Sequence, residues 1–417
     1  MYDVFLKRIT IENVRHLQNV TIPLNTEKKK HLILTGKNGS GKTSLLRALS
    51  QQLNYLVVNG DLSGIENLIN IFQNNINKYR EQQNVSDNKI AEEEKKLQNQ
   101  KNNLESAKAG LTLEFNVNSD ALKAHFDNGE FVLALYEANR KFDANIPKHV
   151  EKVELKDNYG ITESPRNEFV KYILDLKMTE ALARISGKND RADSIHNWFD
   201  NFGNLLKQIF DDESIQLLFD EETFAFSISQ SGRKKFNFQE LSDGFAAILD
   251  IVVDLMVRME KHLNGGLGFD LPGIVLIDEI ETHLHLELQR KVLDFLINVF
   301  PNIQFVVSTH SPFILSSAKN AVIFDMESKT LVENGLSGLP YDGIVRGYFE
   351  VDSLSRELRE KFKRYKLLTG KKELSDDEIE EIAKIETYLD EIPDYLALEI
   401  TTEYRRIKMK FDRREDL

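Results

Sequence analysis

The chain has 417 residues, of which 41% are hydrophobic and 29% are charged, a composition typical of a folded globular protein. It contains no cysteine, which excludes disulfides, thiolate metal sites and a cysteine nucleophile within this sequence. Its formal net charge of −13 disfavours broad electrostatic binding to nucleic acid, because affinity for phosphate comes mainly from clustered Lys and Arg, although a local basic patch stays compatible with it.

The N-terminal segment has apolar runs separated by polar or basic turns, which predicts strands at residues 5–11, 20–24 and 31–35. It lacks the basic stretch and apolar run of a signal peptide. The most apolar stretches, such as residues 246–253, are far shorter than the roughly 20 residues that a membrane span needs. We therefore expect a cytoplasmic protein without a membrane segment.

A glycine-rich loop and a helix follow the third strand. Residues 36–43 read Gly-Lys-Asn-Gly-Ser-Gly-Lys-Thr and fit the phosphate-binding loop at every fixed position. In such a loop the glycines let backbone N–H groups and the helix N-terminus face a polyphosphate, the lysine reaches the β- and γ-phosphates, and the threonine hydroxyl ligates Mg²⁺. The predicted binding residues are Gly36, Lys37, Asn38, Gly39, Ser40, Gly41, Lys42, Thr43 and Ser44, with Thr43 also a metal ligand.

Residues 51–110 differ from their surroundings, because they are rich in Asn, Gln, Glu and Lys. Apolar residues recur at three- and four-residue steps over residues 65–79, and at every seventh residue from Ile90 to Leu111. This predicts an insertion of two helices. Since the partner positions of the second helix are charged, a solvated helical hairpin and a short coiled coil both remain open.

Beyond the insertion, continuous apolar strands alternate with helical patterns, which indicates a parallel sheet covered on both faces. The C-terminal part is charged and helical and ends in a basic tail, which either forms a solvated helix end or contacts nucleic acid or a partner. We expect strands at residues 111–117, 131–136, 273–277 and 303–307, β-rich structure at 215–238, helices at 168–210 and 286–299, and helical structure after residue 353.

Two of these apolar strands end in residues that carry chemistry. The strand at 273–277 is followed by Asp278 and Glu279, and ligands bind at the carboxyl ends of strands in doubly wound sheets. Asp278 is placed to hold Mg²⁺, and Glu279 to act as the base that polarises the attacking water. The strand at 303–307 is followed by Ser-Thr-His, where His310 could donate a hydrogen bond to a γ-phosphate.

Together these motifs resemble the ABC ATPase family, in which a signature motif lies before the acidic strand. Residues 241–245, Leu-Ser-Asp-Gly-Phe, occupy that place, with Asp and Phe where the family usually has Gly and Gln. The resemblance implies ATP and Mg²⁺ as ligands, and implies that Ser242 and Gly244 contact the γ-phosphate of ATP bound to another copy. A head-to-tail homodimer or higher homo-oligomer follows. Arg15 matches an early basic position that relatives bring near the nucleotide, but it is equally compatible with a plain surface residue.

The likeness is greatest to the RecF, OLD and SMC-like branch, which includes stand-alone bacterial ATPases of the AAA_21 and AAA_15 kind. The stretches IDEIETHLH and FVVSTHSPFIL are characteristic of these stand-alone members. Several of them are ATPase subunits of antiphage systems, such as PtuA of Septu or the ATPase of PARIS. The implied fold class is α/β. An ABC ATPase head with a P-loop sheet and an antiparallel β subdomain would span residues 1–50 and 111–350, a helical-hairpin insertion 51–110, and a helical C-terminal extension 351–417.

Three departures from relatives bear on function. The paired cysteines of a zinc hook are absent, and no Toprim motif of OLD nucleases is found after residue 320, so we expect any nuclease to be another chain. No clear Q-loop glutamine is present, and Glu137, Asn139 or Arg140 could stand in its place.

The function expected from the resemblance is that of an ATPase acting as a nucleotide-driven dimerisation switch. It would be the ATPase or sensor subunit of a bacterial antiphage system and would control a separate effector, such as a nuclease. Two alternatives remain open. One is a RecF- or SMC-like DNA-repair or DNA-binding ATPase, which the net charge does not favour, and the other is a non-hydrolysing scaffold, against which Glu279 counts.

Overall fold

A computed structural model of the chain describes residues 3–82, 86–140, 142, 147, 149–262, 269–333, 335–336, 356–371, 373–390 and 398–411. The chain divides into two compact units, Met1–Leu339 and Pro340–Leu417. No helix in the described ranges is both long enough and apolar enough to cross a membrane.

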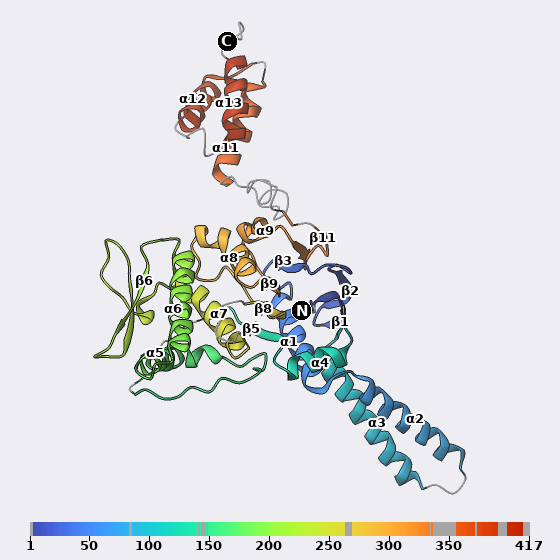
Figure 1. Ribbon diagram of the computed structural model, residues 1–417. Helices are drawn as coiled ribbons and strands as arrows, with labels where there is room; N and C mark the ends of the chain where they lie inside the picture. The colour runs from blue at the N-terminus through green and yellow to red at the C-terminus, as the bar shows by residue number, and fades with distance from the viewer. Residues whose placement is uncertain are drawn as a thin grey trace. The chain divides into compact units, whose positions relative to one another are not determined.

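The first unit is built on a six-stranded sheet with the strand order β11-β10-β3-β9-β8-β5 (Figure 1). The five strands from β10 to β5 are parallel, and β11 pairs antiparallel with β10 at the edge. Every residue of β3, β8 and β9 is buried, which confirms the predicted parallel sheet covered on both faces. The strands are β3 (His31–Thr35), β5 (Val132–Tyr136), β8 (Gly273–Ile277), β9 (Ile303–Ser308), β10 (Ala321–Asp325) and β11 (Leu331–Val332).

A second, antiparallel sheet has β1 (Leu6–Val14) at its centre, between β2 (Leu17–Pro23) and β4 (Leu111–Phe115). Apolar residues at alternating positions of β1, such as Ile9 and Ile11, are fully buried. They belong to one hydrophobic core that also contains residues of the parallel sheet and of the helix after β3. The expected antiparallel subdomain is therefore present and shares its core with the parallel sheet.

Three helices lie between β3 of the parallel sheet and β4 of the antiparallel sheet. Helix α1 (Lys42–Asn59) runs past residue 50, the expected start of the insertion, because its later apolar residues remain buried in the core. Helices α2 (Ser63–Glu81) and α3 (Asp87–Lys108) lie side by side and project from the unit (Figure 1). Ala109 adopts a left-handed conformation (φ 50°) that ends α3, and Leu111 begins β4, which confirms the strand predicted from residue 111.

The remainder of the first unit is largely helical. Helix α7 packs near β5 and α6, and the hairpin of β6 (Gln216–Asp220) and β7 (Ala225–Ser229) lies beside α6. The single tryptophan, Trp198, is buried on α6 and stacks on Phe202 with ring centroids 5.5 Å apart. The helices are α4 (Ser119–Asp127), α5 (Phe169–Ile185), α6 (Asn189–Phe210), α7 (Asp243–Glu260), α8 (Leu286–Val299), α9 (Pro312–Ser317) and the short 3-10 helices η1 (Pro165–Glu168) and η2 (Phe238–Glu240).

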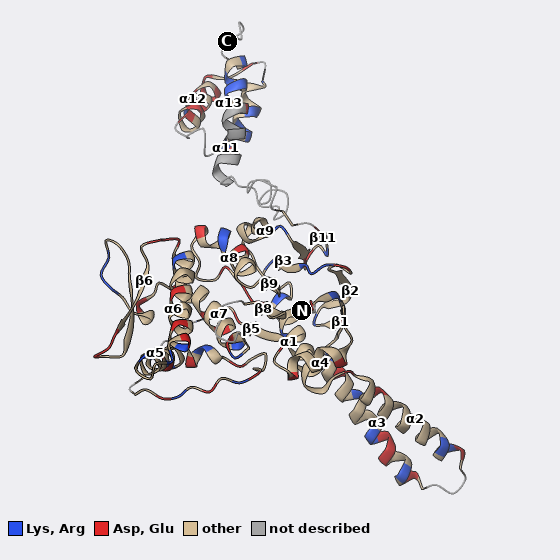
Figure 2. Ribbon diagram, viewed as in Figure 1, with Lys and Arg blue, Asp and Glu red and all other residues tan. Residues whose placement is uncertain are grey.

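The second unit contains α11 (Arg356–Thr369), α12 (Asp376–Asp390) and α13 (Leu398–Phe411), which share a small core around the fully buried Tyr365. The predicted basic tail falls partly on α13, with Lys408 ion-paired to Asp390 at 2.7 Å, while residues 412–417 lie outside the described ranges. In the ribbon of Figure 2, Asp and Glu residues of α12 are coloured red and Lys and Arg residues of α13 are coloured blue. Within this unit the two signs of charge thus lie on neighbouring helices.

Candidate functional site

The predicted site residues follow three strands that are neighbours in the sheet. The glycine-rich loop follows β3, His310 comes soon after β9, and Asp278 and Glu279 follow β8. Because β3, β9 and β8 are parallel, their carboxyl ends meet at one edge of the sheet. Residues far apart in sequence are thereby brought together at this edge.

The loop itself has the backbone conformation that its glycines permit. Gly36, Gly39 and Gly41 have φ angles of 129°, 84° and 98°, which residues with a Cβ atom rarely adopt. The first N–H groups of α1 have no acceptor within the helix and carry the positive end of its dipole. Lys42 is only 6% exposed, and its ammonium donates to the carbonyls of Gly36 (2.7 Å) and Lys37 (3.1 Å). These residues fit a polyphosphate.

The turn between β1 and β2 packs against this loop. His16 Nε2 lies 3.0 Å from the carbonyl oxygen of Ser40, and a Cβ on Gly41 would come within 3.2 Å of the His16 ring. Arg15, which precedes His16, is exposed and has a φ angle of 54°. The fold therefore places Arg15 next to a residue that touches the loop. His16 could not be predicted from the sequence, since no motif marks it and only the pairing of β1 with β2 brings it to the loop.

The acidic residues after β8 are fixed by Ser308 at the end of β9. The Ser308 hydroxyl donates to Asp278 Oδ1 (2.5 Å), and the Glu279 N–H donates to Ser308 Oγ (2.8 Å). Glu279 has a φ angle of 44°, a left-handed conformation that costs on the order of 1–2 kcal/mol for a residue other than glycine. Strain of this kind, sustained by surrounding contacts, is typical of functional turns.

One charged cluster joins the three strand ends. Burial lowers the pKa of the Lys42 ammonium, and nearby carboxylates, first those of Glu279 and Glu281, offset this shift. Burial and then the charge of Lys42 lower the pKa of the His310 imidazole, so it is neutral at pH 7 and can donate one hydrogen bond. Lys42, the carboxylates and His310 thus lie within electrostatic reach of one another.

Glu281 is a further member of this cluster that the sequence analysis did not single out. Its Oε1 accepts from the backbone N–H of His310 (2.5 Å), and its Oε2 is buried without a hydrogen-bond partner in the described structure. The signal that could have identified it is the third carboxylate in the run Asp278-Glu279-Ile280-Glu281.

For the metal, the available ligands are the Thr43 hydroxyl at the start of α1 and the Asp278 carboxylate. Across the described ranges, no group of three or more His, Asp or Glu side chains is arranged to hold a metal. Mg²⁺ is commonly bound by one or two protein groups together with substrate phosphates, so Thr43 and Asp278 suit that cation.

The signature residues lie at the start of α7. Ser242 is exposed and makes no side-chain hydrogen bond that caps its helix. Gly244 is buried, and a Cβ there would come within 3.0 Å of the His283 carbonyl oxygen, in the segment that follows Glu279. Phe245, where the resembling family has glutamine, stacks on Phe210 with ring centroids 4.4 Å apart. Contacts within the chain therefore explain why a residue without a side chain fits at position 244 and an aromatic residue fits at position 245.

The three Q-loop candidates differ in environment. Glu137 is exposed and ion-paired with Arg47 of α1 (3.1 Å), and Asn139 is exposed. Arg140 is buried and donates to backbone carbonyls. A guanidinium has only N–H donors and no acceptor, so Arg140 cannot supply a ligand to Mg²⁺.

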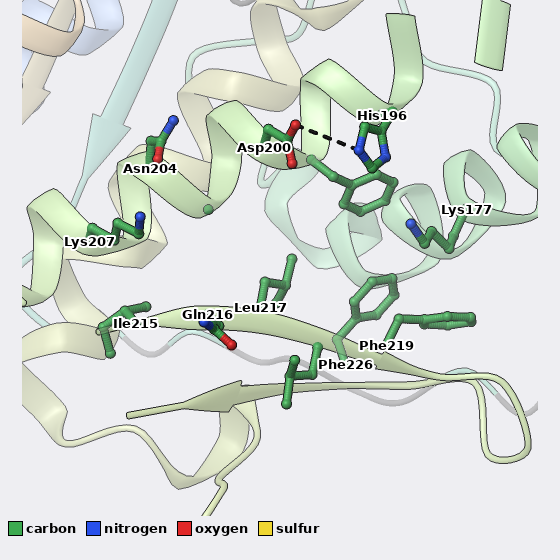
Figure 3. Close-up of a pocket in the computed structure, with 13 residues that line it drawn as sticks. Lys177, His196, Asp200, Asn204, Lys207, Ile215, Gln216, Leu217, Phe219 and Phe226 are labelled. Atoms are coloured by element: carbon green, nitrogen blue, oxygen red, sulfur yellow. Dashed lines mark ion pairs between the residues drawn. The ribbon is translucent and has the colours of Figure 1, made fainter. Parts of the chain in front are cut away.

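A cavity of about 560 Å³ lies elsewhere in the first unit (Figure 3). Asp200 and Asn204 of α6 line one side, and Gln216 and Leu217 of β6 line the other. Residues of the glycine-rich loop are not among its lining residues. The cavity is therefore separate from the charged cluster at the strand ends.

Comparison with known proteins gave several matches. The chain is 26% identical to the Septu protein PtuA of Bacillus mycoides over 405 residues, which cover 92% of this chain and 50% of PtuA. It is 30% identical to the Retron Ec83 probable ATPase of Escherichia coli over 162 residues, 38% of this chain and 28% of that protein. The chain thus spans about half the length of PtuA and less than a third of the length of the Ec83 ATPase. A crystal structure of an SMC head bound to the C-winged helix domain of ScpA aligns with a TM-score of 0.38 and 14% identity, covering 80% of this chain and 98% of that one.

A family model described as "AAA domain, putative AbiEii toxin, Type IV TA system" matches residues 32–316, more than half of the chain. The match includes the glycine-rich loop, the acidic residues after β8 and His310. The chain therefore belongs to this AAA_21 family of ATPase domains.

Proposed function

We propose that this chain binds ATP with Mg²⁺ and hydrolyses it to ADP and phosphate at the edge formed by β3, β9 and β8. The observation that carries the proposal is the convergence of Lys42, Glu279 and His310 at the carboxyl ends of three neighbouring parallel strands. A cation for phosphates, a carboxylate base and a neutral hydrogen-bond donor are the groups that phosphoryl transfer to water requires.

Each residue has a distinct part in this reaction. Lys42 and the loop N–H groups bind the β- and γ-phosphates, while Thr43 and Asp278 hold Mg²⁺, which neutralises phosphate charge when bound. Glu279 accepts a proton from the attacking water. As this happens, the water oxygen bonds to the γ-phosphorus, and the bond between the γ-phosphorus and the bridging oxygen of the β-phosphate breaks. His310 donates a hydrogen bond to a γ-phosphate oxygen, and Arg15 lies beside the loop.

We also propose that Ser242 and Gly244 of a second copy complete the site, so that ATP closes a head-to-tail dimer and hydrolysis reopens it. The exposed Ser242, which does not cap its own helix, supports this.

In the cell, we propose that this switch serves antiphage defence and controls a separate effector, such as a nuclease. Support comes from the likeness to proteins named for the Septu system and for a retron. The likeness is partial, because the chain spans only half of PtuA, so its partners can differ. The net charge of −13 favours this role over a DNA-binding one.

A mixing experiment tests the shared site. Ser242→Arg places a bulky side chain where a partner's phosphate would lie, and Lys42→Ala removes the phosphate cation, so each protein alone should be inactive. In a 1:1 mixture half of the dimers are mixed and each has one intact site, so about a quarter of the parent ATPase rate should return if the sites are independent.

The matched control mixes Lys42→Ala with Glu279→Gln. Both residues belong to the same chain's half of a site, so no mixed dimer has an intact site and no activity should return. Equal recovery in both mixtures, or no recovery in the first mixture together with unchanged monomers in ATP, would contradict the shared site.

A further inference from the structure

A buried arginine holds the turn that carries Glu279. Arg140, which follows β5, is 4% exposed, and its guanidinium donates to the carbonyls of Asp278 (2.8 Å), Glu279 (3.0 Å) and Ile280 (3.2 Å). The same guanidinium donates to the carbonyl of Glu137 (3.2 Å) at the start of its own loop. Three consecutive carbonyls of the catalytic turn therefore converge on one side chain.

This convergence is tied to the conformation of the turn. In an extended strand, successive carbonyls point in opposite directions, so three in a row can share one donor group only where the backbone bends sharply. The left-handed Glu279 (φ 44°) supplies that bend. A planar guanidinium with several N–H donors matches clustered acceptors better than an ammonium, which is a compact point charge.

Arg140 is also linked to the helix that begins at the signature. Burial lowers the pKa of Arg140, and the carboxylate of Asp250 on α7 is the first of the charges that offset it. Asp250 is itself fully buried and lies 2.6 Å from Arg166 Nε of η1. The guanidinium thus contacts the carbonyls of the turn and lies within electrostatic reach of Asp250 on α7.

We propose that Arg140 is a positioning residue for hydrolysis, which holds the Glu279 turn in its catalytic conformation without touching the nucleotide. The inference rests on the proposed role of Glu279 as general base. It assigns a structural link to the base to the loop after β5, where the resemblance leads us to expect a Q-loop glutamine.

A matched pair of substitutions tests this role. Arg140→Lys keeps the positive charge but loses the fork that spans the three carbonyls. Arg258→Lys makes the same change at an equally buried arginine, whose guanidinium donates to the carbonyls of Leu133 and Gly160 and not to the turn. We expect Arg140→Lys to lower kcat by at least about 10-fold with ATP affinity within twofold, since misplacing a catalytic group costs rate rather than binding. Arg258→Lys should keep kcat within about twofold.

A double-mutant cycle separates positioning from a general structural effect. If Arg140 acts through Glu279, Arg140→Lys should lower the single-turnover rate by no more than about twofold in a Glu279→Gln background. Retention of the parent kcat by Arg140→Lys, equal losses in Arg140→Lys and Arg258→Lys, or a full 10-fold loss in the Glu279→Gln background would overturn the inference. A Glu279→Gln protein with the parent rate would instead show that the proposed base is wrong, so the two failures are distinguished.

Discussion

The nucleotide edge and the α2–α3 arm are built in opposite ways. At the edge, the strands β3, β8 and β9 are buried along their whole length, and each supplies site residues at its end. In the 22-residue α3, only Leu97 and Ala107 are buried, and polar contacts such as Asn75–Glu93 (3.2 Å) join it to α2. Tightly packed strands fix the positions of catalytic groups, whereas a solvated hairpin tolerates change. Substitutions should therefore have large effects at the edge and small ones on the arm.

The largest difference is expected for lysines. Lys42→Ala should weaken ATP binding by about 100-fold or more, because a charged hydrogen-bond donor in a buried site contributes roughly 3 kcal/mol. Lys101→Ala, at an exposed position of the arm, should leave affinity within about twofold. Titration calorimetry with ATP and Mg²⁺ measures the affinity of both variants. If Lys42→Ala bound ATP as tightly as the parent protein, the glycine-rich loop would not be the phosphate-binding site.

Carboxylates should show the next largest contrast. Glu279→Gln should slow hydrolysis by about 100-fold or more while ATP still binds, since losing a general base typically costs this much. Glu94→Gln on the arm, where the carboxylate pairs only with the exposed Arg80 (2.6 Å), should keep the parent rate. Steady-state phosphate release compares the variants, and a rate within twofold of the parent in Glu279→Gln would exclude it as the base.

Leucines test the packing difference directly. Leu34 of β3 is fully buried, so Leu34→Ala should lower the free energy of unfolding by about 2–5 kcal/mol. Leu97 is one of only two buried residues of α3, so Leu97→Ala should lower the free energy of unfolding by about 1 kcal/mol or less, because the neighbouring solvated side chains can close the space. Denaturant titrations of both variants give the comparison. Equal losses would show that the arm is packed as tightly as the sheet.

The smallest predicted effect concerns pH. Burial raises the pKa of Asp250 from its ordinary value of 3.8 to about 7. The stability that this group contributes is present in full below about pH 4 and is lost as the pH rises towards 7, since the folded state disfavours the charged form. Between pH 5.5 and pH 8 the parent should therefore lose roughly 2 kcal/mol that Asp250→Asn does not lose. Denaturant titrations at the two pH values measure this, and identical losses in both proteins would refute the shift.

Short motifs were sufficient to predict the edge. The loop at residues 36–43 and the strands β3 and β8 were predicted at their observed bounds, because glycine spacing and continuous apolar runs are local signals. Contacts between distant segments leave no such signal. The position of His16, which no motif marks, depends on the pairing of β1 with β2. Arg140 was named only as a stand-in for a Q-loop glutamine, and its contact with the turn depends on the pairing of β5 with β8.

Helix boundaries in the polar insertion were harder to predict. The insertion was expected to begin at residue 51, but α1 continues to Asn59 because its later apolar residues are buried in the core. The short helix α4 was not predicted, although Asn118 caps it by accepting from the N–H of Ala121 (2.8 Å). Burial and capping decide these helix ends, and neither leaves a periodic signal in the sequence.

The most direct test of the account is the mass of the Glu279→Gln protein in solution, measured by light scattering with and without ATP and Mg²⁺. Because this variant should bind ATP without cleaving it, we expect a monomer without nucleotide and a stable dimer with ATP, and Ser242→Arg added to the same protein should abolish the dimer. A monomer that is saturated with ATP at high protein concentration would contradict the shared site and leave a self-contained ATPase.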